Sequence, residues 1–81
     1  MTVRVLLFDV LRREIGAPEV TAEMPDGATG DALLDRLALS HAPIARHRPT
    51  IRLAVGHRYV PLATTIAPGA EVALITPVSG G

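Results

Sequence analysis

The sequence predicts an α+β fold in which one main helix packs on a mixed five-stranded sheet. Five short segments show the alternation of apolar and other residues that is typical of strands. One longer segment, after Thr29, carries apolar residues at helical spacing. Of the 81 residues, 48% are apolar and only 20% are charged, which is enough to form a core. Because a single helix can cover only one face of a sheet, the expected architecture is a roll with one open sheet face.

The first half of the chain is expected to contain two strands and two helical segments. Residues 3–9 alternate as a strand, residues 10–15 look helical up to Gly16, and residues 19–24 form a second strand before a turn at 25–27. Thr29 can cap the main helix, and its apolar stripe would form part of the core. The stripe consists of Leu33, Leu34, Leu37 and Ala38. The helix should end before Pro43.

The second half is expected to contain three strands. Residues 40–49 are predicted to be a loop, followed by a strand at 51–55, a tight connection at 56–58 and a short strand at 59–62. A turn at 67–70 leads into the last strand, 71–76. No repeat, linker or low-complexity tract interrupts the sequence. We therefore expect one domain over residues 1–81, with a flexible C-terminal tail at 77–81.

Composition excludes several kinds of chemistry. The chain has no cysteine, which removes disulfides and thiol nucleophiles and fits a cytoplasmic location. All eight basic residues are arginines, so no lysine is available for Schiff-base chemistry. Eight acidic residues balance them, and a net charge of zero argues against nucleic-acid binding. No apolar run is long enough to cross a membrane, and no signal peptide is apparent.

Candidate catalytic and metal sites are weak. The histidines, His41, His47 and His57, are expected in loops without the spacing of metal ligands, so no metal is predicted. The basic segment 46–48 could meet a phosphate or an acidic partner, although such loops are usually solvated surface. No nucleophile–base motif or phosphate-binding glycine loop appears. The chain is not expected to be a catalyst on its own.

The outward face of the sheet carries a more informative signal. By alternation, Phe8, Tyr59 and Ile75 lie on the non-core faces of the first, fourth and fifth strands. Three large apolar side chains on one exposed face indicate a partner-binding patch. The alternative is a register error of one residue, which would turn them into the core.

The C-terminal segment is unusual. After the last strand come Pro77, Val78 and Ser79, and then the glycine pair Gly80-Gly81. Proline ends ladder pairing, and the glycines carry no side chain. Such an arm could pass through a narrow channel and present the α-carboxylate of Gly81 to another protein. A frayed terminus is the alternative.

Taken together, these features resemble a known family. The chain is similar to the small, sulfur-carrying subunit of molybdopterin synthase, a ubiquitin-like β-grasp family. The blocks that carry the resemblance are the opening strand with residues 11–16, the helix entry at 25–29, residues 53–55, 68–73 and the terminal 77–81. Two positions depart from the common pattern: Thr76 stands where a proline is usual, and Gly56 where an asparagine is usual.

The resemblance implies a role for each part of the tail. Gly81 would be adenylated by a ubiquitin-activating-type enzyme that uses ATP, and a sulfur-donor enzyme would supply sulfur for a thiocarboxylate. Pro77, Val78, Ser79 and Gly80 would insert into the large synthase subunit, where sulfur passes to cyclic pyranopterin monophosphate in molybdenum cofactor biosynthesis. No cofactor would be bound by this chain. Two other functions remain compatible: a sulfur carrier for thiazole or cysteine synthesis, and a ubiquitin-like protein modifier.

Overall fold

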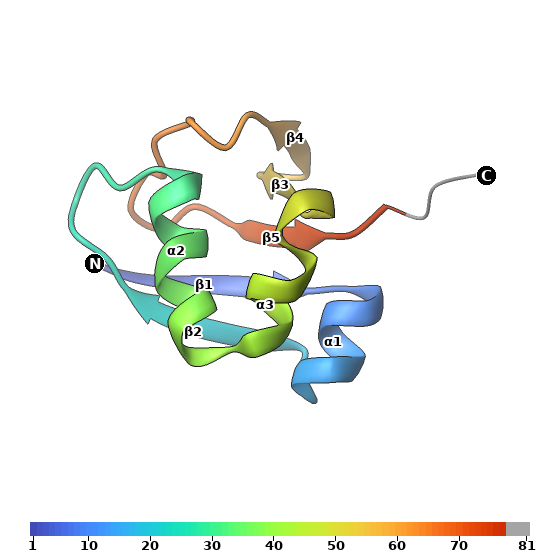
Figure 1. Ribbon diagram of the computed structural model, residues 1–81. Helices are drawn as coiled ribbons and strands as arrows, with labels where there is room; N and C mark the ends of the chain where they lie inside the picture. The colour runs from blue at the N-terminus through green and yellow to red at the C-terminus, as the bar shows by residue number, and fades with distance from the viewer. Residues whose placement is uncertain (78–81) are drawn as a thin grey trace.

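The computed structural model describes residues 1–77 and contains a five-stranded mixed sheet with helices on one side (Figure 1). The elements follow the order β1 (Thr2–Leu7), α1 (Asp9–Ile15), β2 (Glu19–Glu23), α2 (Gly30–Ser40), α3 (Ala42–His47), the 3₁₀ helix η1 (Arg48–Thr50), β3 (Arg52–Val55), β4 (Arg58–Val60) and β5 (Val72–Ile75). The predicted α+β class with one main helix over a mixed sheet is confirmed.

The sheet order is β2-β1-β5-β3-β4, so the first and last strands are central neighbours. β1 and β5 run parallel, and the other neighbouring pairs are antiparallel. Parallel pairing takes the C-terminal ends of β1 and β5 to the same end of the sheet, where α1 also lies (Figure 1). The root of the predicted tail therefore lies beside the β1–α1 junction.

The core lies between the sheet and the helices. The predicted stripe on α2 is largely confirmed, because Leu33, Leu34 and Leu37 are buried and Ala38 packs against the core at its edge. The predicted start of α2 and the predicted end of α1 are confirmed. Thr29 Oγ1 accepts a hydrogen bond from the Ala32 amide at 3.2 Å, and Gly16 closes α1 with φ of 82°.

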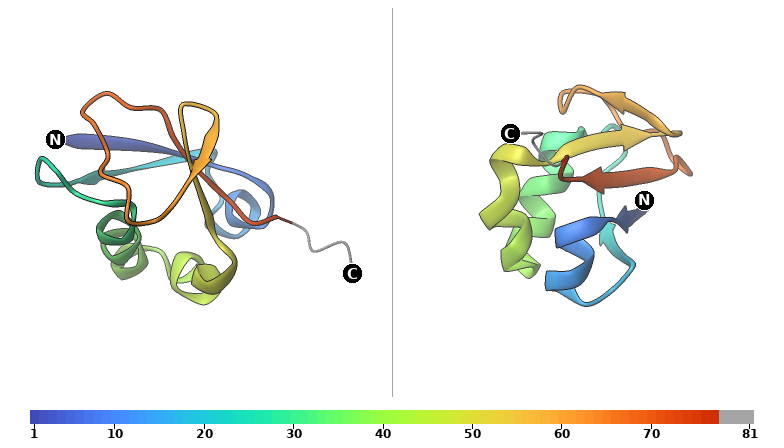
Figure 2. Two further views of the ribbon diagram at one scale, coloured as in Figure 1. Left: turned by 90° about the horizontal axis from the view of Figure 1, so that it is seen from above. Right: turned by 90° about the vertical axis from the view of Figure 1, so that its right-hand side faces the viewer.

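No helix of residues 1–77 covers the opposite face of the sheet (Figure 2). None of the helices in this range is long and apolar enough to span a bilayer. The open face is consequently where an exposed binding surface can form.

One prediction was wrong. Residues 40–49 are not a loop: they contain the start of η1 and the whole of α3, which places His47 in a helix. The main helix α2 ends at Ser40, before Pro43 as predicted, but Pro43 then lies in the first turn of α3, where no backbone N–H is needed. Ile44 is completely buried and anchors this short helix to the core. Its tertiary packing, rather than its length, explains why it forms.

The predicted strand boundaries also shift by a few residues. β1 ends at Leu7, so Phe8 and Asp9 lie outside it, and Asp9 has a positive φ of 53° where the chain turns into α1. β4 covers Arg58–Val60 rather than 59–62, because Pro61 cannot donate to a ladder. These shifts leave the assignment of side chains to the two sheet faces unchanged.

The connection between β3 and β4 is a tight turn that contains Gly56. Gly56 and His57 have φ values of 59° and 67°, and a two-residue hairpin turn with both φ angles positive is of type I′. Glycine and asparagine are the residues that adopt this conformation most easily. Glycine at position 56 therefore suits the backbone of this turn.

The basic segment 46–48 is engaged within the molecule. Arg46 Nη2 donates to Glu14 Oε1 at 2.6 Å, and His47 Nε2 lies 3.0 Å from the same oxygen, which ties α3 to α1. Arg48 Nη1 donates to Asp35 on α2 at 2.8 Å. The hydrogen bond from Arg46, followed by that from His47, lowers the pKa of Glu14 below its ordinary value. The segment is thus a set of inter-helix contacts rather than a free cationic loop.

The lowered pKa predicts how stability depends on pH. A carboxyl group whose pKa is depressed on folding contributes stability above its unfolded pKa, and this contribution disappears as pH falls through the folded value. We therefore expect wild type to be more stable than Glu14→Gln at neutral pH, and the difference to shrink as pH falls below the ordinary pKa of 4.5 and to disappear below the lowered pKa of the folded protein. Thermal midpoints measured at pH 7 and pH 3 test this. The control is Asp26→Asn, whose carboxylate is 86% exposed. If Glu14→Gln lowers the thermal midpoint equally at both pH values, the prediction is contradicted.

Candidate functional site

The three apolar residues predicted on the outward face lie around one groove. Phe8, Tyr59 and Ile75 all border a hollow of about 280 Å³ on the open face of the sheet. Phe8 is 42% exposed and Tyr59 65% exposed, while Ile75 is half-buried. The alternative register, which would have placed them in the core, is therefore wrong. Their predicted role in partner binding remains a prediction.

Phe8 reaches this face by a different route from the one predicted. It follows β1 instead of belonging to it, and it keeps an extended backbone (φ −129°, ψ 156°) as the N-cap residue of α1. The extended conformation continues the alternation of β1 by one residue, so the side chain still points outward. Because Leu7 is in register with Leu74, Phe8 comes next to Ile75. The β1–α1 junction thus completes the wall of the groove nearest the tail.

The floor of the groove consists of residues that sequence reasoning did not assign to a site. Leu6 is in register with Ala73, Ala73 with Ala54, and Ala54 with Tyr59, so one row crosses four strands. The two central members of the row have only a methyl group, whereas Leu6 and Tyr59 stand at its ends. Small residues flanked by large ones produce a depression. Alternation alone indicates that these side chains point outward, but it does not indicate that Ala54 and Ala73 are neighbours.

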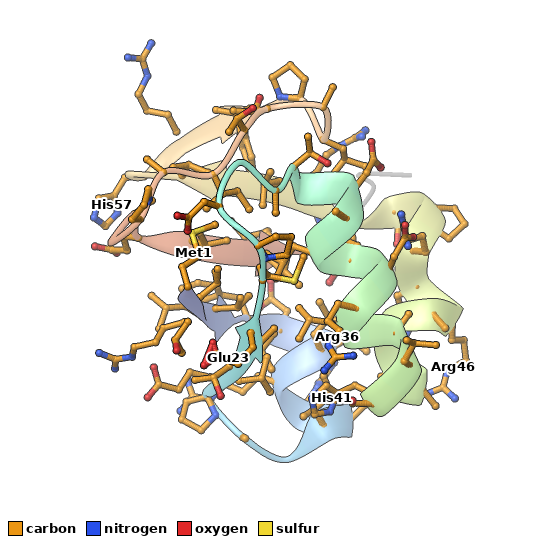
Figure 3. The ribbon with its side chains drawn as sticks, turned by 90° about the vertical axis from the view of Figure 1, so that its left-hand side faces the viewer. Met1, Glu23, Arg36, His41, Arg46 and His57 are labelled. Atoms are coloured by element: carbon orange, nitrogen blue, oxygen red, sulfur yellow. The ribbon has the colours of Figure 1, made fainter. Side chains whose placement is uncertain are left out.

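Charged residues border the groove at both ends. At the end away from the tail, His57 Nε2 lies 3.2 Å from Glu71 Oε1, and both residues line the groove. At the tail end, Arg52 is in register with Ile75 and is exposed. Figure 3 shows His57 on the sheet side of the molecule and Arg46 on the helical side. The exposed histidine turn therefore belongs to the open face.

A larger hollow of about 570 Å³ lies beside the start of β1 and the segment 66–71. Its walls include the charged side chains of Arg4, Glu19 and Glu71, and it shares only Leu6 and Glu71 with the first groove. We take the smaller groove as the candidate site because the large apolar residues converge there and because it adjoins the root of the tail. Affinity depends on such anchors more than on the size of a cavity.

The predicted tail residues fall largely beyond this description. Pro77 is the last described residue, and Val78, Ser79, Gly80 and Gly81 lie outside the described residues. Within residues 1–77 no group of three metal-ligating side chains is close enough to hold a metal ion. Figure 3 also shows His41 and His57 in different parts of the molecule. The groove is the site that the described part of the chain offers.

Comparison with known proteins agrees with this architecture. The model of the ThiS family matches residues 5–81. A molybdopterin synthase sulfur carrier subunit of Arabidopsis thaliana is 34% identical over 79 residues, covering 98% of this chain and 82% of that protein. SAMP1 from Haloferax volcanii superposes with a TM-score of 0.82 at 28% identity, with both chains fully covered.

A further solved structure shares the fold. It is a complex of subunits 1 and 2 of the molybdopterin-converting factor from Helicobacter pylori. The matching chain superposes with a TM-score of 0.64 at 20% identity, and both chains are covered completely. The match of the family model to nearly the whole chain, together with the relative at 34% identity, decides the assignment. The chain belongs to the ThiS family, the ubiquitin-like β-grasp sulfur carriers that include the sulfur carrier subunit of molybdopterin synthase.

Proposed function

We propose that this chain carries sulfur on the C-terminal carboxyl of Gly81 and donates it to cyclic pyranopterin monophosphate in molybdopterin synthesis. The observation that supports this most directly is the match of the family model through Gly81, combined with identity to molybdopterin synthase sulfur carrier subunits. The open sheet face supplies a docking surface next to the root of the tail. Separate surfaces for recognition and chemistry are what a carrier needs.

The proposed chemistry begins with activation. A carboxylate is a poor electrophile, so one of its oxygens attacks the α-phosphorus of ATP and pyrophosphate leaves. The resulting acyl-adenylate has a good leaving group. A sulfide-level sulfur from the donor enzyme then attacks the carbonyl carbon, AMP departs with the oxygen, and a thiocarboxylate remains on Gly81. All catalytic groups for these steps belong to the activating enzyme, and this chain contributes the reacting carboxyl group.

In the second stage, the tail would enter the large subunit of the synthase. Gly80 and Gly81 have no β-carbon to obstruct a narrow channel, and Val78 would occupy an apolar part of it. Pro77 and Ser79 would form the rest of the inserted segment. The apolar groove bordered by Phe8, Tyr59 and Ile75 would hold the body of the carrier on its partner while the tail reacts. The solved complex of subunits 1 and 2 of the Helicobacter pylori molybdopterin-converting factor, one chain of which shares this fold, supports a partner subunit.

Intact-mass spectrometry tests the proposed chemistry. The protein is incubated with its cognate adenylating enzyme, ATP and sulfide, and we expect a mass increase equal to the exchange of one oxygen for sulfur at Gly81. The matched control is Gly81→Ala. Its added methyl group should leave docking through the sheet face intact but obstruct the tail and reduce sulfur transfer. Absence of the mass change with a competent enzyme would eliminate the sulfur-carrier proposal.

A second candidate function is supported by a specific likeness. SAMP1 from Haloferax volcanii is described as a small archaeal modifier protein, and it shares fold and full-length coverage with this chain. A modifier would form amide bonds between Gly81 and lysines of other proteins. Cell extracts probed with an antibody to this chain distinguish the two functions. We expect mainly free protein, whereas abundant slower-migrating conjugates that depend on Gly81 would favour the modifier.

A further inference from the structure

The charges around the sheet-face groove are distributed unevenly between its two ends. At the tail end, the guanidinium of Arg52 is exposed beside Ile75, its partner in the β3–β5 register. Within residues 1–77, Arg52 has no hydrogen bond or ion pair through its side chain. Among residues 1–77, this end of the groove thus carries the exposed guanidinium of Arg52 next to the last residue of β5.

The opposite end of the groove is acidic. In the adjoining larger hollow, Arg4 Nη2 lies 2.9 Å from Glu19 Oε2, so this pair compensates itself. Glu71 is left with His57, whose imidazole is charged only when protonated. With neutral His57, the three charged groups leave one net negative charge. Glu71 immediately precedes β5 and lies four positions before Ile75, which corresponds to about 13 Å along an extended strand.

The apolar part of the groove does not by itself define one orientation of a partner. Its floor is a pair of alanines, and large apolar side chains stand on both sides of that floor. A partner rotated in the plane of the sheet could bury a similar apolar area, because hydrophobic contact is not directional. Opposite charges at the two ends make the orientations unequal, since juxtaposed like charges are unfavourable and complementary ones are favourable.

We propose that Arg52 and Glu71 are the residues that orient the partner on this face, so that the opening for the tail lies over the Arg52 end. The proposal rests on the function proposed above and defines the chemistry of the partner. The partner should present an apolar docking surface with a carboxylate beside the mouth of its channel and a basic side chain about 13 Å from that carboxylate. A partner with the reverse polarity would be held with its channel facing away from Pro77.

Charges at the rim act mainly on association. They are exposed, so salt screens them over about 8 Å at physiological ionic strength, and they steer encounter more than they strengthen the final contact. A variant that changes one of these charges should therefore associate more slowly than wild type at low salt and as fast as wild type at high salt. Loss of an apolar anchor, by contrast, should act mainly on dissociation and be insensitive to salt.

The experiment compares Arg52→Glu with Arg58→Glu. Arg58 is also exposed and lies on the adjacent strand, but it alternates with Tyr59 and so points away from the open face. Association with the cognate large subunit of molybdopterin synthase is measured by stopped-flow at low and high ionic strength. We expect Arg52→Glu to slow association about tenfold at low salt and to match wild type near 1 M salt. Arg58→Glu should behave as wild type throughout.

Two outcomes would overturn the orientation proposal. One is an equal effect of the two charge reversals, which would mean that association depends only on the net charge of the protein. The other is an effect of Arg52→Glu that persists at high salt with a lowered thermal midpoint, which would indicate a structural role. Phe8→Ala, measured in the same series, separates this proposal from the function on which it rests. If Phe8→Ala weakens binding but Arg52→Glu does not, only the orientation proposal fails; if neither does, the sheet face is not the docking surface.

Discussion

Replacing Phe8 with alanine is expected to weaken binding of the large synthase subunit about thirtyfold while leaving the fold intact. Truncation of a central aromatic anchor typically costs about 2 kcal/mol of binding free energy, and this converts to the stated loss of affinity. Phe8 is 42% exposed at the edge of the groove, so its removal leaves little of the core uncovered. Titration by isothermal calorimetry measures the affinity, and circular dichroism gives the thermal midpoint.

Leu53→Ala provides the control for that experiment. Leu53 is 1% exposed in the core below the sheet, and truncation of a buried leucine costs about 2–5 kcal/mol of stability. Its thermal midpoint should therefore fall well below that of Phe8→Ala. If Phe8→Ala unfolds at the same temperature as Leu53→Ala, Phe8 serves the core, and the docking surface has to be abandoned.

The second large effect is expected at Gly30, the first residue of α2. A β-carbon there would overlap with Leu53 Cδ2 and come within 2.9 Å of the carbonyl oxygen of Leu62. The leucine methyl can move, but the backbone oxygen is held, since it accepts a hydrogen bond from the Asp31 amide at 2.9 Å. Overpacking of this kind costs about 1–3 kcal/mol. We expect Gly30→Ala to lower the free energy of unfolding by that amount in urea denaturation.

Substitutions at Gly16 serve as a control that distinguishes a steric cause of destabilisation from a conformational one. Nothing lies within 4 Å of a β-carbon at Gly16, but its φ of 82° disfavours L-residues. Asparagine tolerates that conformation, so Gly16→Asn should be less destabilising than Gly16→Ala. At Gly30, asparagine should be at least as harmful as alanine, because space rather than φ is limiting. If Gly30→Ala is as stable as wild type, α2 can shift away from β3 to make room for the added methyl group.

Several features of this protein followed from its sequence because they depend on neighbours along the chain. Alternation assigned Phe8, Tyr59 and Ile75 to the open face, and the structure agrees. Gly16 and Thr29 marked helix ends through local hydrogen bonding. The end of the main helix before Pro43 was also predicted correctly, whereas the short helix that begins around Pro43 and the end of β4 before Pro61 were not, because a proline is compatible with the start as well as the end of an element.

Other features were decided by contacts between distant segments. Residues 42–47 are too few for a helix to form alone, and α3 exists because Ile44 is buried against the rest of the core. The groove has an alanine floor only because β3 pairs with β5 in the register that joins Ala54 to Ala73. Periodicity within one strand specifies which face a side chain takes, but not which strand lies beside it or in which register. For the same reason, the sequence named the three large apolar residues that border the groove, whereas the tertiary structure alone placed Arg52 beside Ile75 at the root of the tail.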